Sequence, residues 1–290
     1  MTASTDTIAP GATRARRRST LRLLTASGAV IVAALVAMPR VSAERLLDKD
    51  VKALIERIDE ERDRFEDKLD GKIKNSVLRG AGGEVHVERF LDDLQENVDK
   101  LKERFQSDYS ASAEATTVLR QGTDIQRFMS KQAPNIDGAS EWNRLAASLG
   151  ELGKVYGTAF PLPEGQQARR FNDAEVEKVA SGLADSADQF KKDLESVLKT
   201  NMTIDQPTKD AAIRAVDDLK EDAKKLASRI DDEKPASGEA KAVLDRAARI
   251  RGAAASSGRT LSPAAQSAWG AIETGLEKVA LAFDLPARLP

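Results

Sequence analysis

Apolar residues recur at three- and four-residue steps through most of the chain after residue 45, the spacing of one face of an α-helix. The first run, residues 46–73, contains no proline and predicts a single helix of about 28 residues. Further runs at residues 87–105, 115–129 and 142–156 predict three more amphipathic helices. A Pro- and Gly-rich segment, residues 157–165, then interrupts the pattern.

The rest of the chain repeats this plan. Residues 48–128, compared with the sequence 125 positions later and without a gap, are identical at 21 of 81 positions. Trp142 and Trp269, the only two tryptophans, are each followed by apolar residues at +3, +7, +10 and +14, which end at Tyr156 and Phe283. Self-similarity at a fixed long period indicates a duplicated supersecondary unit.

Short connections between helices place neighbours antiparallel. We therefore predict an all-α chain, a tandem duplication of a four-helix up-and-down bundle unit preceded by a cleavable N-terminal signal segment. The predicted boundaries are residues 1–43 for the signal peptide, 44–160 for unit 1, 161–171 for a linker and 172–286 for unit 2. An extended helical array with one continuous core is the alternative.

Helix-start signals agree with this register. Asn172 with Glu175 three residues later forms a capping-box pattern. Ser262 followed by Pro263 is a cap followed by proline at the first helical position. A further helix is predicted to begin at Pro207.

The N-terminal segment has the layout of a signal peptide. Five arginines between residues 14 and 22 precede an apolar run at residues 23–38, and Val41-Ser42-Ala43 fits a small-residue cleavage site. The apolar run has 16 residues, fewer than the roughly 20 of a bilayer span. We predict cleavage after Ala43 and export to the periplasm or the medium. An uncleaved membrane anchor is the alternative, and the choice between Sec and twin-arginine export stays open.

Removal of residues 1–43 would change the formal net charge from −2 to −7. A mildly acidic surface with both signs interspersed argues against nucleic acid and anionic membranes as partners, because both require clustered basic residues. The chain has no cysteine, so disulfides cannot stabilise it and its cohesion must come from apolar burial.

The aromatic residues of the repeated pattern are expected to anchor two cores rather than to form a ligand platform, because they lie on the apolar stripes of their helices. The predicted core anchors are Trp142, Tyr156, Trp269, Phe283, Phe65 and Phe190. Three other phenylalanines of unit 1 have small or aliphatic counterparts in unit 2, namely Phe90/Ala215, Phe105/Ile230 and Phe128/Ala253. Unit 2 should therefore have closer helices or, less favourably, an apolar cavity.

One charged pair recurs at the same places in both units. Arg104 and Glu114, repeated as Arg229 and Glu239, flank the turn between the second and third helices of each unit. In an antiparallel helix pair these side chains would meet, and a carboxylate in a first helical turn is favoured by the helix dipole. We predict two candidate inter-helix salt bridges.

Other candidates for chemistry have simpler structural explanations. His86 is the only histidine, lacks metal-ligand partners and corresponds to Ala211, so it is expected on the surface. Asp92-Asp93 recurs as Asp217-Asp218 and is expected to form helix-surface pairs with Arg89 and Arg214. Residues 80–83 are expected to form a flexible glycine turn and do not match a phosphate loop. We predict no catalytic residue, no cofactor and no metal site.

The pattern W-x2-L-x3-L-x2-L-x3-Y at Trp142–Tyr156, together with ERFLDDLQENVDKLKERF before it, resembles exported all-helical bacterial proteins that repeat this helix motif. The resemblance implies the fold and the export and carries no activity. We expect a non-enzymatic protein with a structural or interaction role in the cell envelope, with protein partners and an undetermined oligomeric state. The alternative is a periplasmic binder of apolar ligand or unfolded polypeptide through the bundle grooves.

Overall fold

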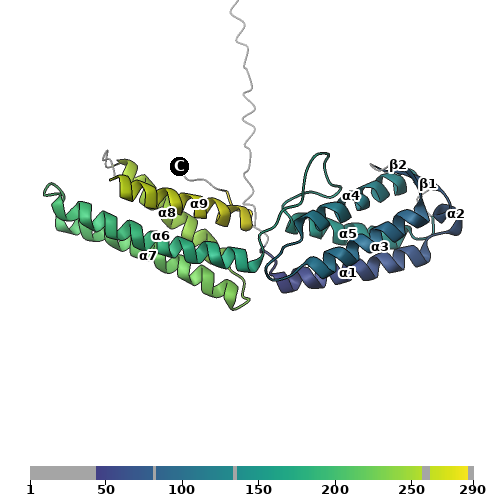
Figure 1. Ribbon diagram of the computed structural model, residues 1–290, viewed down its shortest axis with the longest axis horizontal. Coiled ribbons are helices and arrows are strands. Elements are labelled where there is room, and N and C mark those ends of the chain that lie inside the picture. Colours follow the sequence, from purple (N-terminus) through teal and green to yellow (C-terminus); the bar gives the residue numbers. More distant parts are fainter. Residues whose placement is uncertain (1–43, 81–82, 133–135, 257–261, 287–290) are drawn as a thin grey trace, which may run out of the picture. The chain divides into compact units, whose positions relative to one another are not determined.

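The computed structural model describes residues 44–80, 83–132, 136–256 and 262–286, all within one compact unit, Val41–Pro290. The predicted signal peptide lies outside the described residues. The described chain is all-α apart from one short hairpin (Figure 1). Its elements are α1 (Asp48–Lys68), α2 (Gly71–Lys74), β1 (Val77–Gly80), β2 (Gly83–His86), α3 (Val87–Arg104), α4 (Ser112–Met129), α5 (Ala139–Val155), α6 (Asp173–Thr200), α7 (Gln206–Asp231), α8 (Ser237–Ser256) and α9 (Pro263–Ala282).

The long helices associate in two sets of four. In the first helix group α1 packs against α3 and α5, while α4 packs against α3 and α5. In the second helix group α6 packs against α7 and α9, while α8 packs against α7 and α9. Each helix thus contacts two neighbours in a closed ring, and the first helix of each group meets the last (Figure 1).

The long first helix predicted over residues 46–73 is wrong at its C-terminal end. The helix α1 ends at Lys68, Leu69 adopts an extended conformation, and the short helix α2 begins at Gly71. Asp70 separates the two helices because its side chain accepts a hydrogen bond from the Lys72 amide, capping α2. The counterpart sequence in α6 is Leu194-Glu195-Ser196, which offers no such break, and α6 runs for 28 residues.

The glycine turn expected at residues 80–83 belongs to an antiparallel hairpin. Strands β1 and β2 pair Val77 with His86 and Leu78 with Val85, and residues 81–82 of the loop lie outside the described residues. Leu78 is buried in the first core, whereas Arg79 and Glu84 form an exposed ion pair at 2.6 Å. Val77 and Arg79 are exposed on either side of buried Leu78, whereas no residue of β2 is buried, so the hairpin has almost no two-residue periodicity in the sequence.

The predicted helix starts in the second group are confirmed. Asn172 and Glu175 form a complete capping box at α6, and the Ser262 side chain accepts from the Ala265 amide at α9 with Pro263 following. The helix α7 begins at Gln206, one residue before the predicted Pro207. These caps satisfy amide groups that would otherwise lack partners in the first turn.

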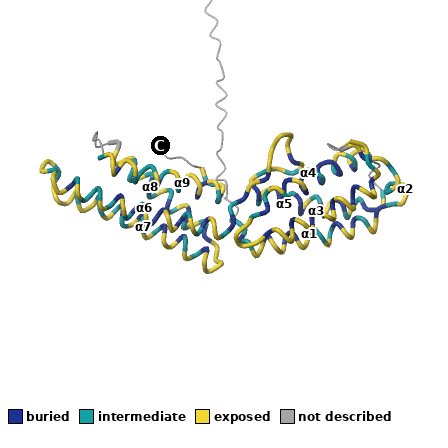
Figure 2. The backbone as a smooth tube through the Cα atoms, in the orientation of Figure 1, coloured by how far each residue is buried: buried dark blue, intermediate teal, exposed yellow. Residues whose placement is uncertain are grey.

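Each helix group encloses its own cluster of buried apolar side chains, and Figure 2 shows buried positions recurring along one side of the helices. The first core is rich in aromatic residues, including Phe90 and Phe105. The second core uses alanine extensively, at positions 180, 184, 187, 223, 240, 247 and 265. Glycine permits close approach in both cores, because an added Cβ would lie 2.7 Å from the Leu183 side chain at Gly275 and 2.6 Å from the Leu149 side chain at Gly122. The closer helix spacing expected in the second unit stays a prediction.

The segment predicted as a linker is packed against the first helix group. Leu162 and Ala168 are buried in the first core. Their amides donate to the hydroxyls of Thr123 and Thr116 on α4, at 2.7 and 2.9 Å. The connection is therefore an ordered strap along α4, with residues 163–167 exposed between the two attachment points.

Candidate functional site

A cluster of largely buried charged side chains lies where α1 and α6 begin. It consists of Arg45, Asp48, Arg170 and Asp173, which we call the reciprocal clamp. Arg45 forms an ion pair with Asp173, and Arg170 forms one with Asp48 at 2.6 Å. Both pairs join residues from the start of one helix group to residues from the start of the other.

The contacts of the clamp are matched on its two sides. The Asp48 amide donates to the Asp173 carboxylate at 2.8 Å, and the Asp173 amide donates to the Asp48 carboxylate at 2.9 Å. Each aspartate thus caps the first turn of the other helix. The Arg45 guanidinium also donates to the Phe171 carbonyl and that of Arg170 to the Leu46 carbonyl, both at 2.8 Å.

Each of these contacts has a counterpart in which both residues are replaced by their equivalents in the 125-residue comparison. Arg45 corresponds to Arg170 and Asp48 to Asp173, so each aspartate is contacted by the arginine of the other half. The match extends to the flanking helices. The Arg170 amide donates to Ser112 Oγ at 3.2 Å, and the Arg45 amide donates to the equivalent Ser237 Oγ at 3.5 Å.

The clamp is largely closed to solvent. The arginine side chains are 4% and 3% exposed for Arg45 and Arg170, and the aspartates are 13% and 17% exposed for Asp48 and Asp173. Burial lowers the pKa of Arg45 and the charge of Arg170 lowers it further, while Asp173 opposes both effects. The guanidinium of Arg45 also lies over the Phe283 ring, 5.7 Å from its centroid.

This cluster was not predicted from the sequence. Arg45 and Arg170 are identical at the 125-residue offset, but they lie just outside the segment compared. An arginine and an aspartate three residues apart before a helix form a common pattern with no specific meaning. The sequence pattern that could have revealed the cluster is R-x-x-D, which occurs at Arg45–Asp48 and again at Arg170–Asp173. In the structure, each of these segments contacts the opposite helix group.

The predicted aromatic anchors form two nearly identical ring pairs. Phe65 lies against Trp142 with ring centroids 5.4 Å apart, and Phe190 lies against Trp269 with centroids 5.3 Å apart. Both pairs have an interplanar angle of 54°. Tyr156, 0% exposed, and Phe283, 3% exposed, occupy the buried ends of α5 and α9.

The two tryptophans differ in their polar partners. The Trp142 ring is 2% exposed and its N–H donates to Gln126 Oε1 at 3.0 Å. Trp269 is only partly buried, and its N–H donates to Glu273 Oε1 at 2.8 Å, a carboxylate that also pairs with Arg251. The second anchor therefore lies at the edge of its core, where its N–H bonds to a member of a surface ion pair and not to a neutral amide.

Tyr156 differs from its counterpart Phe283 by its hydroxyl, which donates to the Ser110 carbonyl at 2.6 Å. Burial raises the pKa of this hydroxyl well above its ordinary value. The group is thus a structural hydrogen-bond donor to the turn before α4.

Both ion pairs predicted at the turns between the second and third helices are formed. Arg104 Nη1 and Glu114 Oε1 are 2.5 Å apart, and Arg229 Nε and Glu239 Oε1 are 3.3 Å apart. The first pair is reinforced by Tyr109, whose ring lies 5.0 Å from the Arg104 guanidinium and whose hydroxyl donates to Glu114. Glu114 is nearly buried, while the two arginines are about half exposed.

A charge-reversal cycle at this turn is expected to show a modest coupling. Arg104→Glu and Glu114→Arg should each destabilise the chain, and the double variant should recover about 0.5–1 kcal/mol, since Arg104 is largely solvated. Urea unfolding of the four proteins measures the coupling. The same cycle at Arg229 and Glu239, without an aromatic partner, is the matched control and should give a smaller value. A coupling of zero at the first turn would contradict the contact.

The paired aspartates of α7 take partners on other helices. Asp217 pairs with Lys191 of α6 at 2.8 Å, and Asp218 pairs with Arg246 of α8 at 2.8 Å. The partner expected for Asp218 was Arg214 on its own helix. Within α3, Glu96 pairs with Lys100 at 2.6 Å. In the second group these charges thus connect neighbouring helices.

Asp188 of α6 offers a pH-dependent example of such a connection. Hydrogen bonds from Lys192 and from Lys220 of α7 lower its pKa from 3.8 to about 2. A carboxylate with a depressed pKa stabilises the fold above pH 3.8, and this contribution is lost as the pH falls through about 2. We expect the Asp188 carboxyl carbon to titrate near pH 2 by NMR, and Lys220→Met to raise the midpoint. A midpoint at 3.8 in the unmodified chain would contradict this.

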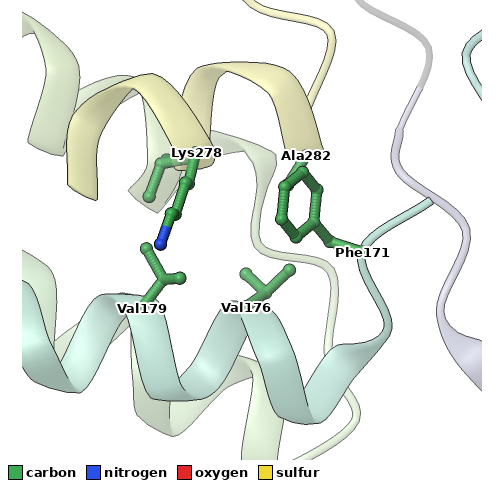
Figure 3. A pocket seen from close by; sticks show the side chains of 6 residues that line it. Phe171, Val176, Val179, Lys278 and Ala282 are labelled. Atoms are coloured by element: carbon green, nitrogen blue, oxygen red, sulfur yellow. The ribbon is translucent and has the colours of Figure 1, made fainter. Parts of the chain in front are cut away.

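A shallow apolar pocket opens between α6 and α9 (Figure 3). Val176 and Val179 project from α6 toward α9, the Phe171 ring lies beside Ala282, and Lys278 extends from α9 along one side (Figure 3). Its empty volume is about 150 Å³ and it is open to solvent. Pockets that enclose a small molecule are typically at least about 300 Å³, so this one accommodates at most a single side chain.

The predicted surface position of the single histidine is confirmed. His86 is exposed and precedes α3, with its ring nitrogen 3.3 Å from the Asn75 carbonyl. Among the described residues no group of three or more metal-ligating side chains comes together. No helix in the described ranges has both the length and the apolar character to cross a membrane.

The chain matches no protein-family model, no curated protein and no solved structure.

Proposed function

We propose that this chain is a tandem duplication of a four-helix unit and acts as a non-enzymatic structural or interaction protein of the bacterial cell envelope. The main support for this proposal is that the residues found at equivalent positions in both halves take part in core packing and in ion pairs. The ring pairs, the turn ion pairs and the reciprocal clamp all fall on equivalent positions. Repeated contacts that stabilise the fold, and do not form a binding or catalytic site, support a role as a structural scaffold.

The envelope location rests on the N-terminal sequence, with its arginines, its apolar run and Val41-Ser42-Ala43. Cleavage after Ala43 would leave Glu44 as the first residue, immediately before Arg45 of the clamp. The mature N-terminus would then begin at the contact between the helix groups. The acidic charge expected after cleavage favours proteins over nucleic acid as partners.

Fractionation of a bacterium that expresses the full chain with a C-terminal tag tests this proposal. We expect the tagged protein in the envelope or periplasmic fraction, with an intact mass that corresponds to a chain beginning at Glu44. Replacement of Ala43 by Arg should block cleavage and leave the longer form. Recovery of the uncut chain from the cytosol in both cases would contradict the proposal.

For the alternative, a binder of apolar ligand or unfolded polypeptide, the pocket beside Phe171 offers a place for at most one apolar side chain. A dye whose fluorescence rises on exposed apolar surface separates the two functions. The proposed scaffold should give a weak response, equal in the wild type and in a Val179→Asp variant of the pocket. A strong response that Val179→Asp abolishes would favour the alternative.

A further inference from the structure

The reciprocal clamp is self-complementary. Arg45 pairs with Asp173 while Arg170 pairs with Asp48, so each side contributes one arginine and one aspartate to the same arrangement. This is the defining property of an isologous interface, in which residue i of one partner contacts residue j of the other and j contacts i. Within one chain, the two partners are the two helix groups.

The connection between the groups has an exposed central stretch. Residues 163–167 are exposed, whereas Leu162 and Ala168 on either side are buried against α4. The hydrogen bonds of Gln166 are made to Pro163 and Thr158, inside the connection itself. If residues 163–167 followed a different path, Ala168 could therefore still bond to Thr116, and every contact of the clamp could still form.

We propose that the reciprocal clamp is a docking surface that a second copy of this chain can complete, with residues 163–167 as the hinge. In such a dimer, residues 168–286 of one chain dock on residues 44–162 of the other. Asp173 of each copy then pairs with Arg45 of its partner, and Arg170 with Asp48. The exchange repeats the contacts of the single chain, which is why exchanging an identical element between protomers has a low energetic cost.

This inference deepens the proposed interaction role by naming one partner, and it rests on the equivalence of the two halves. Protein concentration and the duration of partial unfolding should control the exchange, because the clamp must open before it re-forms between chains. Envelope location is not required, so purified protein suffices for the test.

Two complementary charge variants of the full chain test the proposal. Arg45→Asp and Asp173→Arg each place like charges against each other within the chain and in any dimer of one variant with itself. A mixed dimer of the two variants has two clamps, and both have opposite charges. One clamp contains only wild-type residues. The other joins the aspartate introduced at position 45 of one chain to the arginine introduced at position 173 of the other. We expect each variant alone to be monomeric by light scattering after incubation in moderate urea, and the mixture to form a species of about twice the mass.

The chain that carries both changes is the matched control, because it restores an opposite-charge pair within one molecule and should stay monomeric when dilute. A mixture that remains monomeric while the variants are folded by circular dichroism would overturn the proposal. It would leave the envelope role standing, since fractionation tests that role separately.

A second measurement covers the case in which a single variant does not fold. The chain has no cysteine, so Met202→Cys, at a side chain that is 98% exposed, gives a unique labelling site in the otherwise wild-type protein. Donor- and acceptor-labelled chains, mixed in moderate urea and returned to buffer, should show energy transfer that unmixed refolding does not. Absence of transfer at high micromolar concentration would overturn the proposal.

Discussion

Replacement of Phe65 by alanine is expected to lower the free energy of unfolding by about 3–5 kcal/mol, the usual cost of removing a buried aromatic side chain. Phe65 is 1% exposed and lies against Trp142, so its loss removes both apolar burial and a tilted ring contact. Urea unfolding followed by circular dichroism measures the change. Leu281→Ala, at a position that is 68% exposed, is the control and should change stability by less than about 0.5 kcal/mol.

The equivalent Phe190→Ala should cost less than Phe65→Ala, because its partner Trp269 is only partly buried. The alanine-rich surroundings in the second core also leave fewer large side chains in contact with the ring. Equal and small effects at both positions would show that the ring pairs do not anchor the cores.

Replacement of Arg170 by alanine is expected to destabilise the chain by about 3 kcal/mol or more, since it leaves the nearly buried Asp48 carboxylate without its cation. The loss also removes the bond to the Leu46 carbonyl. Thermal and urea unfolding measure the effect. Arg64→Ala removes an exposed ion pair to Glu60 and is the matched control, for which about 0–1 kcal/mol is expected. Similar costs for the two arginines would contradict the role of the clamp.

The helices were predictable from the sequence because their apolar residues keep a strict three- and four-residue spacing and their caps use recognisable residues. Asn172, Ser262 and Pro263 fixed the starts of α6 and α9. The break in the first helix was harder to predict, because its cause is the single Asp70-Gly71 step within an otherwise continuous apolar pattern. The hairpin was missed because four-residue strands give too short an alternation.

The site was less predictable than the fold. Turn ion pairs such as Arg104–Glu114 join residues ten positions apart, and helix geometry alone places them together. The reciprocal clamp joins residues about 125 positions apart, so its prediction requires knowing how the two halves meet. The apolar pattern does not indicate that Trp269 is partly exposed, nor that its N–H bonds to Glu273, which pairs with Arg251.

Two separate cores, each with one tryptophan packed against it or within it, are joined by the reciprocal clamp. The variants Trp269→Phe and Trp142→Phe leave one fluorescent reporter in each helix group, so urea unfolding can be followed in each group separately. With the clamp intact the two unfolding curves should coincide. With Arg45→Ala and Arg170→Ala added, the alanine-rich second group should unfold at lower urea than the first. Curves that are already separate with the clamp intact, or that still coincide without it, would contradict the account.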